Sequence, residues 1–60
     1  MSEYIERPKT FKKLVEMITA MASEEDRNRV YWNIDRSFER ETIKWQEHEL
    51  LFDLASRVMI

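Results

Sequence analysis

The clearest pattern in the chain is a segment with one apolar and one polar face near the N-terminus. At about 100° per residue, its apolar side chains share a single broad face. These side chains are Phe11, Leu14, Val15, Met17, Ile18, Met21 and Ala22. The spacing predicts an amphipathic helix over residues 11–22. Thr10 is the candidate N-cap, and the alternative places Pro8 in the first helical turn.

A second helix is predicted to begin after Ser23. The Ser23 hydroxyl precedes three acids at residues 24–26, which favour the positive end of a helix dipole. Because no Gly or Pro follows, the simplest prediction is one long helix over residues 24–58. The fold class is then all-α, with the two helices forming a hairpin. The alternative is a break within residues 37–42, where Ser37 or Thr42 would cap a third helix.

The apolar arc of this long helix widens toward its C-terminal end, to about 200° of the circumference. The short helix spans about 18 Å and the long one about 50 Å, so folding back would leave the C-terminal half bare. A bare apolar half predicts a dimer, most simply a four-helix arrangement, or docking onto a larger assembly. The predicted protein interface consists of Trp45, Leu50, Leu51, Phe52, Leu54 and Val58.

Composition restricts the classes of fold and of site. Sixty residues fit one small domain, 1–60, in which residues 1–9 form an N-terminal arm without periodicity. The chain has no Cys and no Gly, and its one Pro is Pro8. Disulfides and thiolate metal sites are therefore excluded. Hairpin-rich β folds and phosphate-binding loops are disfavoured, because their turns need residues with positive φ.

Side chains able to carry catalysis do not form a recognisable set. His48 has no carboxylate three or four residues away, and its neighbours Glu47 and Glu49 point about 100° to either side. Glu49 and Asp53 are four residues apart, but nothing predicts the burial that acid–base chemistry needs. We expect no catalytic, metal or cofactor site and no small-molecule substrate. An enzyme is the most distant of the three functional classes considered.

A basic stripe is the second candidate surface. On a continuous helix, its basic residues fall within about 80° of one another. The stripe consists of Arg29, Arg36, Arg40 and Lys44, with Trp32 at its edge. Such a face could hold phosphates while Trp32 stacks on a base. The competing interpretation is a solvated face with the local ion pairs Glu25–Arg29 and Glu41–Lys44, favoured because the net charge is −2.

The leading functional prediction is a small acidic protein-binding module, acting as a regulator, inhibitor or assembly factor on another protein chain. The alternative is a dimeric nucleic-acid-binding protein that uses the basic stripe. In a variant of that alternative, residues 1–9 pair as an intermolecular strand, although they lack clean alternation. The apolar runs are too short to span a membrane and Met1–Tyr4 does not resemble a signal peptide, so we expect a cytoplasmic protein.

Overall fold

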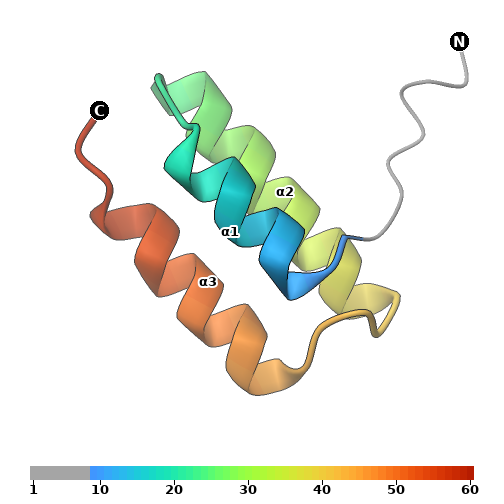
Figure 1. Ribbon diagram of the computed structural model, residues 1–60. Coiled ribbons are helices and arrows are strands. Elements are labelled where there is room, and N and C mark those ends of the chain that lie inside the picture. Colours follow the sequence, from blue (N-terminus) through green and yellow to red (C-terminus); the bar gives the residue numbers. More distant parts are fainter. Residues whose placement is uncertain (1–8) are drawn as a thin grey trace, which may run out of the picture.

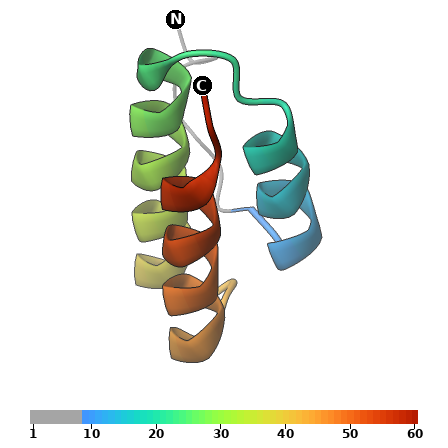
Figure 2. The ribbon, with the colours of Figure 1, turned by 90° about the vertical axis from the view of Figure 1, so that its left-hand side faces the viewer.

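Three packed helices make up the domain in the computed structural model, which describes residues 9–60. They are α1 (Phe11–Thr19), α2 (Glu24–Glu39) and α3 (Trp45–Arg57). α2 runs antiparallel to both of its neighbours, so that α1 and α3 point the same way (Figures 1 and 2). No β-strand occurs in residues 9–60, which confirms the all-α prediction for that range. The predicted arm, apart from Lys9, lies outside the described residues.

The prediction of one long helix over residues 24–58 is wrong, and the three-helix alternative is confirmed. The helical conformation ends after Glu39 and resumes at Trp45. Glu41 has a φ of 64°, a left-handed conformation that ends the helix without glycine. The Thr42 N–H then donates to the carbonyl of Ser37 at 3.0 Å. The turn relies on an uncommon backbone state of a non-glycine residue, which sequence spacing does not show.

The start of α3 corrects a second prediction, that Ser37 or Thr42 caps a third helix. Ser37 lies fully buried within α2. The Thr42 hydroxyl lies 3.2 Å from the Ser37 carbonyl, in the turn before α3. Lys44 is the N-cap residue, and its backbone N–H donates to the Glu47 side chain at 2.8 Å. A carboxylate reaching back from the first turn therefore stabilises this helix start.

The other two helix starts follow the predictions. Thr10 caps α1, accepting a hydrogen bond from the Lys13 N–H at 3.2 Å. Ser23 caps α2 and accepts one from the Asp26 N–H at the same distance. The end of α1 was predicted too late, because the helix stops at Thr19 rather than at residue 22.

The core lies on the inner faces of the three helices and at one end of the bundle. Its buried apolar members are Leu14, Ile18, Val30, Ile34, Ile43, Leu51 and Ala55. Ile43 belongs to the turn between α2 and α3, and Leu51 and Ala55 belong to α3. Because α3 folds back, one chain supplies the apolar cover that a continuous helix would have lacked. The length argument for a partner chain therefore does not hold.

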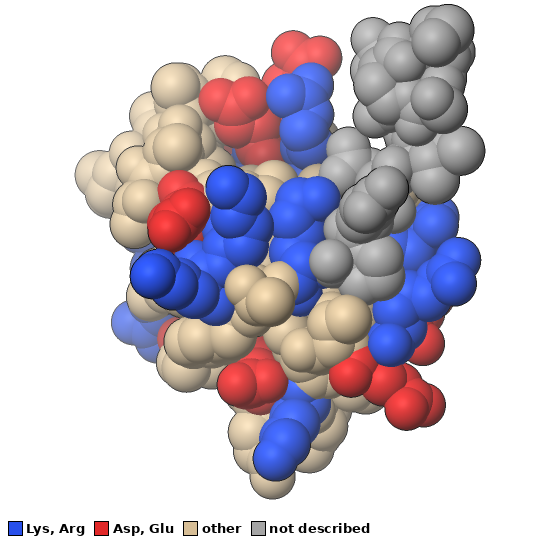
Figure 3. Space-filling model, turned by 45° about the vertical axis from the view of Figure 1, so that its right-hand side comes forward, with Lys and Arg blue, Asp and Glu red and all other residues tan. Residues whose placement is uncertain are grey.

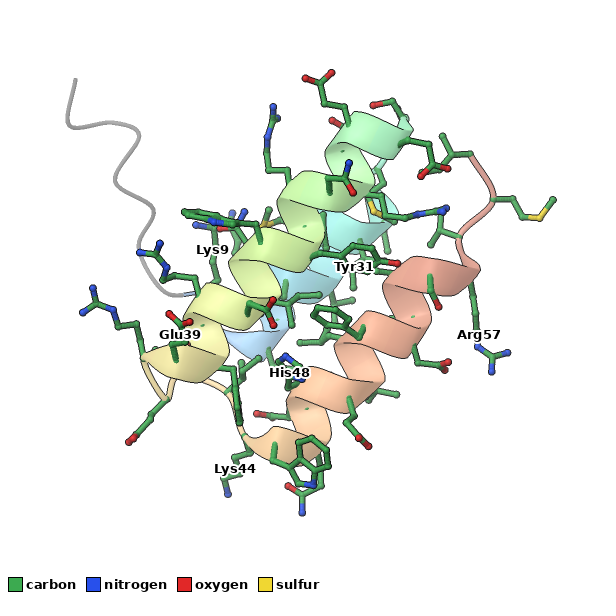
Figure 4. All side chains as sticks on the ribbon, turned by 180° about the vertical axis from the view of Figure 1, so that it is seen from behind. Lys9, Tyr31, Glu39, Lys44, His48 and Arg57 are labelled. Carbon is green, nitrogen blue, oxygen red and sulfur yellow. The ribbon has the colours of Figure 1, made fainter. Side chains whose placement is uncertain are left out.

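Aromatic rings line the boundary between α2 and α3. Tyr31 stacks on Phe52 and Phe52 on His48, while the Phe38 ring is tilted by 46° against His48; ring centroids are 4.8 Å apart at each step. His48 Nε2 also lies 2.8 Å from the Asp35 carboxylate. Figure 4 shows Tyr31 and His48 pointing into this boundary from opposite helices. Ring stacking and one polar pair thus hold α3 against α2.

Two sets of hydrogen bonds attach the segments that flank the helices. The Lys9 N–H donates to the Ser37 hydroxyl at 2.8 Å, and the Thr42 hydroxyl donates to the Lys9 carbonyl at 2.8 Å. Near the other end of the described chain, the Arg27 guanidinium donates to the Val58 carbonyl. In each set the flanking segment contributes backbone groups, and the side chains come from α2 and the turn that follows it.

Candidate binding surfaces

The predicted interface residues occupy three different environments. Leu51 is in the core, with 0% of its surface exposed. Phe52 and Val58 are half-buried and pack against that core. The remaining three stay exposed: Trp45 (55%), Leu50 (52%) and Leu54 (38%). The apolar pattern of the sequence identified candidates for contact but did not separate intrachain contacts from free surface.

Leu50 and Leu54 form one continuous surface feature, which we call the leucine ridge. They are one turn apart on α3, about 40° from each other by helical phase. Trp45 lies about 140° from Leu50 by the same measure, so it belongs to a different surface. One flank of α3, with His48 and Phe52, contacts α2. The ridge therefore lies on the opposite flank, toward α1.

α3 itself carries more acidic than basic side chains around the leucine ridge. α3 carries three carboxylates, Glu47, Glu49 and Asp53, against one basic side chain, Arg57. By helical phase Glu47 lies about 20° from Leu54, whereas Asp53 and Arg57 lie about 60° and 20° from Leu50. Arg57 Nε pairs with Asp53 Oδ2 at 3.0 Å, so two acids and one base adjoin the ridge. The ridge is thus an apolar contact surface with a negative border.

The second surface is the basic stripe on α2, now without one of its predicted members. Arg29 and Arg36 lie in α2, and Arg40 is its C-cap. Lys44 is the N-cap of α3, beyond the turn, so the helical phase that placed it in the stripe does not apply. Trp32 is 45% exposed. In Figure 3, basic side chains gather across the middle of the face shown.

The local ion pairs predicted to neutralise the stripe are not the ones that form. Arg36 lies 3.9 Å from Glu39, and no carboxylate within residues 9–60 pairs with Arg29 or Arg40. The Arg36 guanidinium sits over the Trp32 ring, 4.6 Å from its centroid. The pairs Glu25–Arg29 and Glu41–Lys44 are absent from the described structure. Within residues 9–60, two of the three guanidinium groups have no carboxylate partner and could bind an anion.

The residues weighed for catalysis are used in packing or lie at the surface. His48 is engaged with Asp35 and the aromatic stack, and its Nδ1 is buried without a hydrogen-bond partner in the described region. Asp53 is bound to Arg57 at the surface. The described part of the chain shows no pocket and no group of three candidate metal ligands. Nor does it contain a helix long and apolar enough to cross a membrane.

Sequence reasoning missed the pairing of Asp35 with His48. The two residues are 13 positions apart, and on a continuous helix they could not meet. A signal was nevertheless present, because Tyr31 and Phe38 on α2 and His48 and Phe52 on α3 each have helical spacing. Two ring pairs at that spacing indicate helices that pack side by side once a turn separates them.

Comparison with known proteins identifies no relative of this chain. No protein-family model matches the chain, and no curated protein or solved structure matches it significantly. The chemistry of the two surfaces therefore carries the functional argument.

Proposed function

We propose that this protein is a binding module whose leucine ridge docks against an amphipathic helix of a partner protein. The observation that carries the proposal is the pair Leu50 and Leu54, exposed one turn apart on a helix whose inner face is already buried. Such a module would act by occupying or joining its partner, as a regulator, inhibitor or assembly factor.

The geometry of the ridge suits a helical partner. Side chains four residues apart on one helix insert between the side-chain rows of another helix. Helix-binding proteins commonly use anchors at this spacing. Two half-exposed leucines are a small contact, so the partner must contribute apolar side chains of its own to exclude water around them.

Charge favours a basic partner over a second copy of this chain. In a dimer formed through the ridge, the acidic border of one α3 would approach the acidic border of the other, and like charges there oppose association. A partner helix with Lys or Arg beside its apolar stripe would instead gain attraction from Glu47 and Asp53. Dimerisation, expected from the sequence, is therefore the competing use of the same ridge.

The test uses two labelled amphipathic peptides of roughly 18 residues, one with a Leu stripe and Lys rim and one with a Leu stripe and Glu rim. Fluorescence anisotropy should show binding of the Lys-rimmed peptide alone, weakening as salt is added. The double variant Leu50→Ser and Leu54→Ser should bind at least about tenfold more weakly. Trp45→Ser is the matched control, since it removes an exposed apolar side chain elsewhere on α3.

Two outcomes would contradict the proposal. The first is equal weakening by the Trp45 control, which would mean that the peptide binds the surface without using the ridge. The second is a dimer in sedimentation equilibrium that strengthens with salt and is lost in the ridge variant. That result would assign the ridge to self-association, because salt screens the repulsion between two acidic borders.

A further inference from the structure

The basic stripe and the leucine ridge lie on opposite sides of α1. One flank of α2, with Asp35 and Phe38, faces α3. The other flank holds Ser37, which binds the backbone of Lys9 just before α1 begins. The stripe, now Arg29, Trp32, Arg36 and Arg40, continues from this second flank toward solvent. A ligand on the stripe and a helix on the ridge would therefore not compete for space.

The three guanidinium groups follow the axis of α2. Arg36 and Arg40 are separated by about 6 Å along the helix and Arg29 and Arg36 by about 10 Å, so the stripe is about 16 Å long. Arg36 alone has a carboxylate neighbour within residues 9–60, and the 3.9 Å separation makes that contact weak. The arrangement is a line of positive charge suited to several anionic groups in a row.

Trp32 gives the stripe a flat surface as well as charge. Its indole is 45% exposed, and the Arg36 guanidinium lies over the ring. Stacking uses the face of a guanidinium, so its N–H groups remain directed outward, where they can donate to phosphate oxygens. A large exposed aromatic side chain beside a line of arginines has no role in the core of this domain.

From this combination we propose that the stripe binds single-stranded nucleic acid. Arg29, Arg36 and Arg40 would contact successive phosphates while a base stacks on Trp32. An acidic protein segment could satisfy the arginines, but it would leave the Trp32 platform without a flat partner. Stacking on an aromatic side chain is tolerant of base identity, so we expect little sequence preference.

The experiment uses the full chain with Trp45→Phe, which leaves Trp32 as its one indole. A 12-nucleotide oligo-dT is titrated at low salt while fluorescence and anisotropy are recorded. Binding should quench Trp32 as a base stacks on it. The affinity should fall with salt at a logarithmic slope of about −2, as expected for three phosphate contacts to a single strand.

Variants locate the site on the stripe. Arg36→Gln with Arg40→Gln should flatten the salt slope by more than one unit. Trp32→Leu should weaken binding by about 5- to 150-fold, the range measured for loss of one stacked base. Arg57→Gln is the matched control, because Arg57 is an exposed arginine on α3; its variant should bind oligo-dT as the parent does. Circular dichroism of each variant checks that helicity is retained.

Three results would overturn the inference. One is the absence of any oligo-dT binding at low salt. Another is an equal loss of affinity in the Arg57 control, which would indicate diffuse charge attraction. The third is binding of a poly-Glu peptide as tight as that of oligo-dT with no change in Trp32 fluorescence, which would assign the stripe to an acidic protein. None of these results bears on the leucine ridge, which is tested with peptides.

Discussion

Leu50 and Leu51 are adjacent leucines for which the structure predicts opposite consequences of truncation. Leu51 is 0% exposed and belongs to the core cluster, whereas Leu50 is 52% exposed. We expect Leu51→Ala to lower the free energy of unfolding by about 2–5 kcal/mol, because it removes a buried side chain and leaves a cavity. We expect Leu50→Ala to cost less than about 1 kcal/mol, because its side chain is only partly withdrawn from water.

The size of the Leu51 effect matters because the domain is small. A 60-residue domain has a total stability of about 3–9 kcal/mol. Leu51→Ala would therefore remove a large part of that stability, and a substantial fraction of the variant would be unfolded at ordinary temperature. Leu50→Ala should keep its fold and instead lose affinity for the Lys-rimmed peptide. The two leucines thus separate stability from binding.

The assay is urea denaturation followed by circular dichroism at two protein concentrations about 50-fold apart. For a monomeric three-helix domain the unfolding midpoint is independent of concentration, whereas a dimer is stabilised as concentration rises. Equal destabilisation by the two substitutions, together with a concentration-dependent midpoint, would refute the reasoning. It would mean that both faces of α3 are buried, one of them against another chain.

Further predictions concern positions that each test one local feature by urea denaturation. Glu41→Gly should raise the free energy of unfolding by about 1 kcal/mol, because glycine accepts the left-handed conformation at φ 64° without a steric penalty; a loss would show that the Glu41 side chain makes a stabilising contact. Asn33→Leu should raise it by about 1 kcal/mol, because Asn33 is buried and its Oδ1 has no partner in the described residues, although its Nδ2 donates to the Arg29 carbonyl at 2.9 Å; destabilisation would indicate that the loss of the Nδ2 hydrogen bond outweighs the relief of the unpartnered oxygen. Ser23→Ala should lower it by about 1 kcal/mol through loss of the α2 cap, while the exposed Ser56→Ala should not; equal effects would rule out capping as the cause.

The helix starts could be predicted because their signals are local. Thr10 and Ser23 each precede an amphipathic segment, and each caps it as expected. The end of α2 could not be predicted, since Glu41 is the kind of residue that normally continues a helix. Its left-handed conformation is selected by contacts formed after folding, such as the burial of Ile43 and the hydrogen bond from Thr42 to Ser37.

The relative positions of the surface residues could be predicted only where those residues share one uninterrupted helix. Arg29, Trp32 and Arg36 lie within one uninterrupted helix, so their relative phase followed directly from the sequence. Lys44 was misplaced because the break comes before it. Leu50 and Leu51 could not be distinguished by periodicity, because which side of α3 is inward depends on the number and direction of its neighbours. That information is absent from the spacing of a single helix.

The hydrogen bonds to the backbone of Lys9 and Val58 restrict which residue types can occupy the positions that supply the side chains. In both cases the flanking residue contributes backbone groups, which every residue type has apart from the missing N–H of proline. Ser37, Thr42 and Arg27 contribute side chains that few other residues can replace. Related sequences should therefore keep a small hydroxyl at position 37 and a long cation at position 27, and should lack proline at position 9.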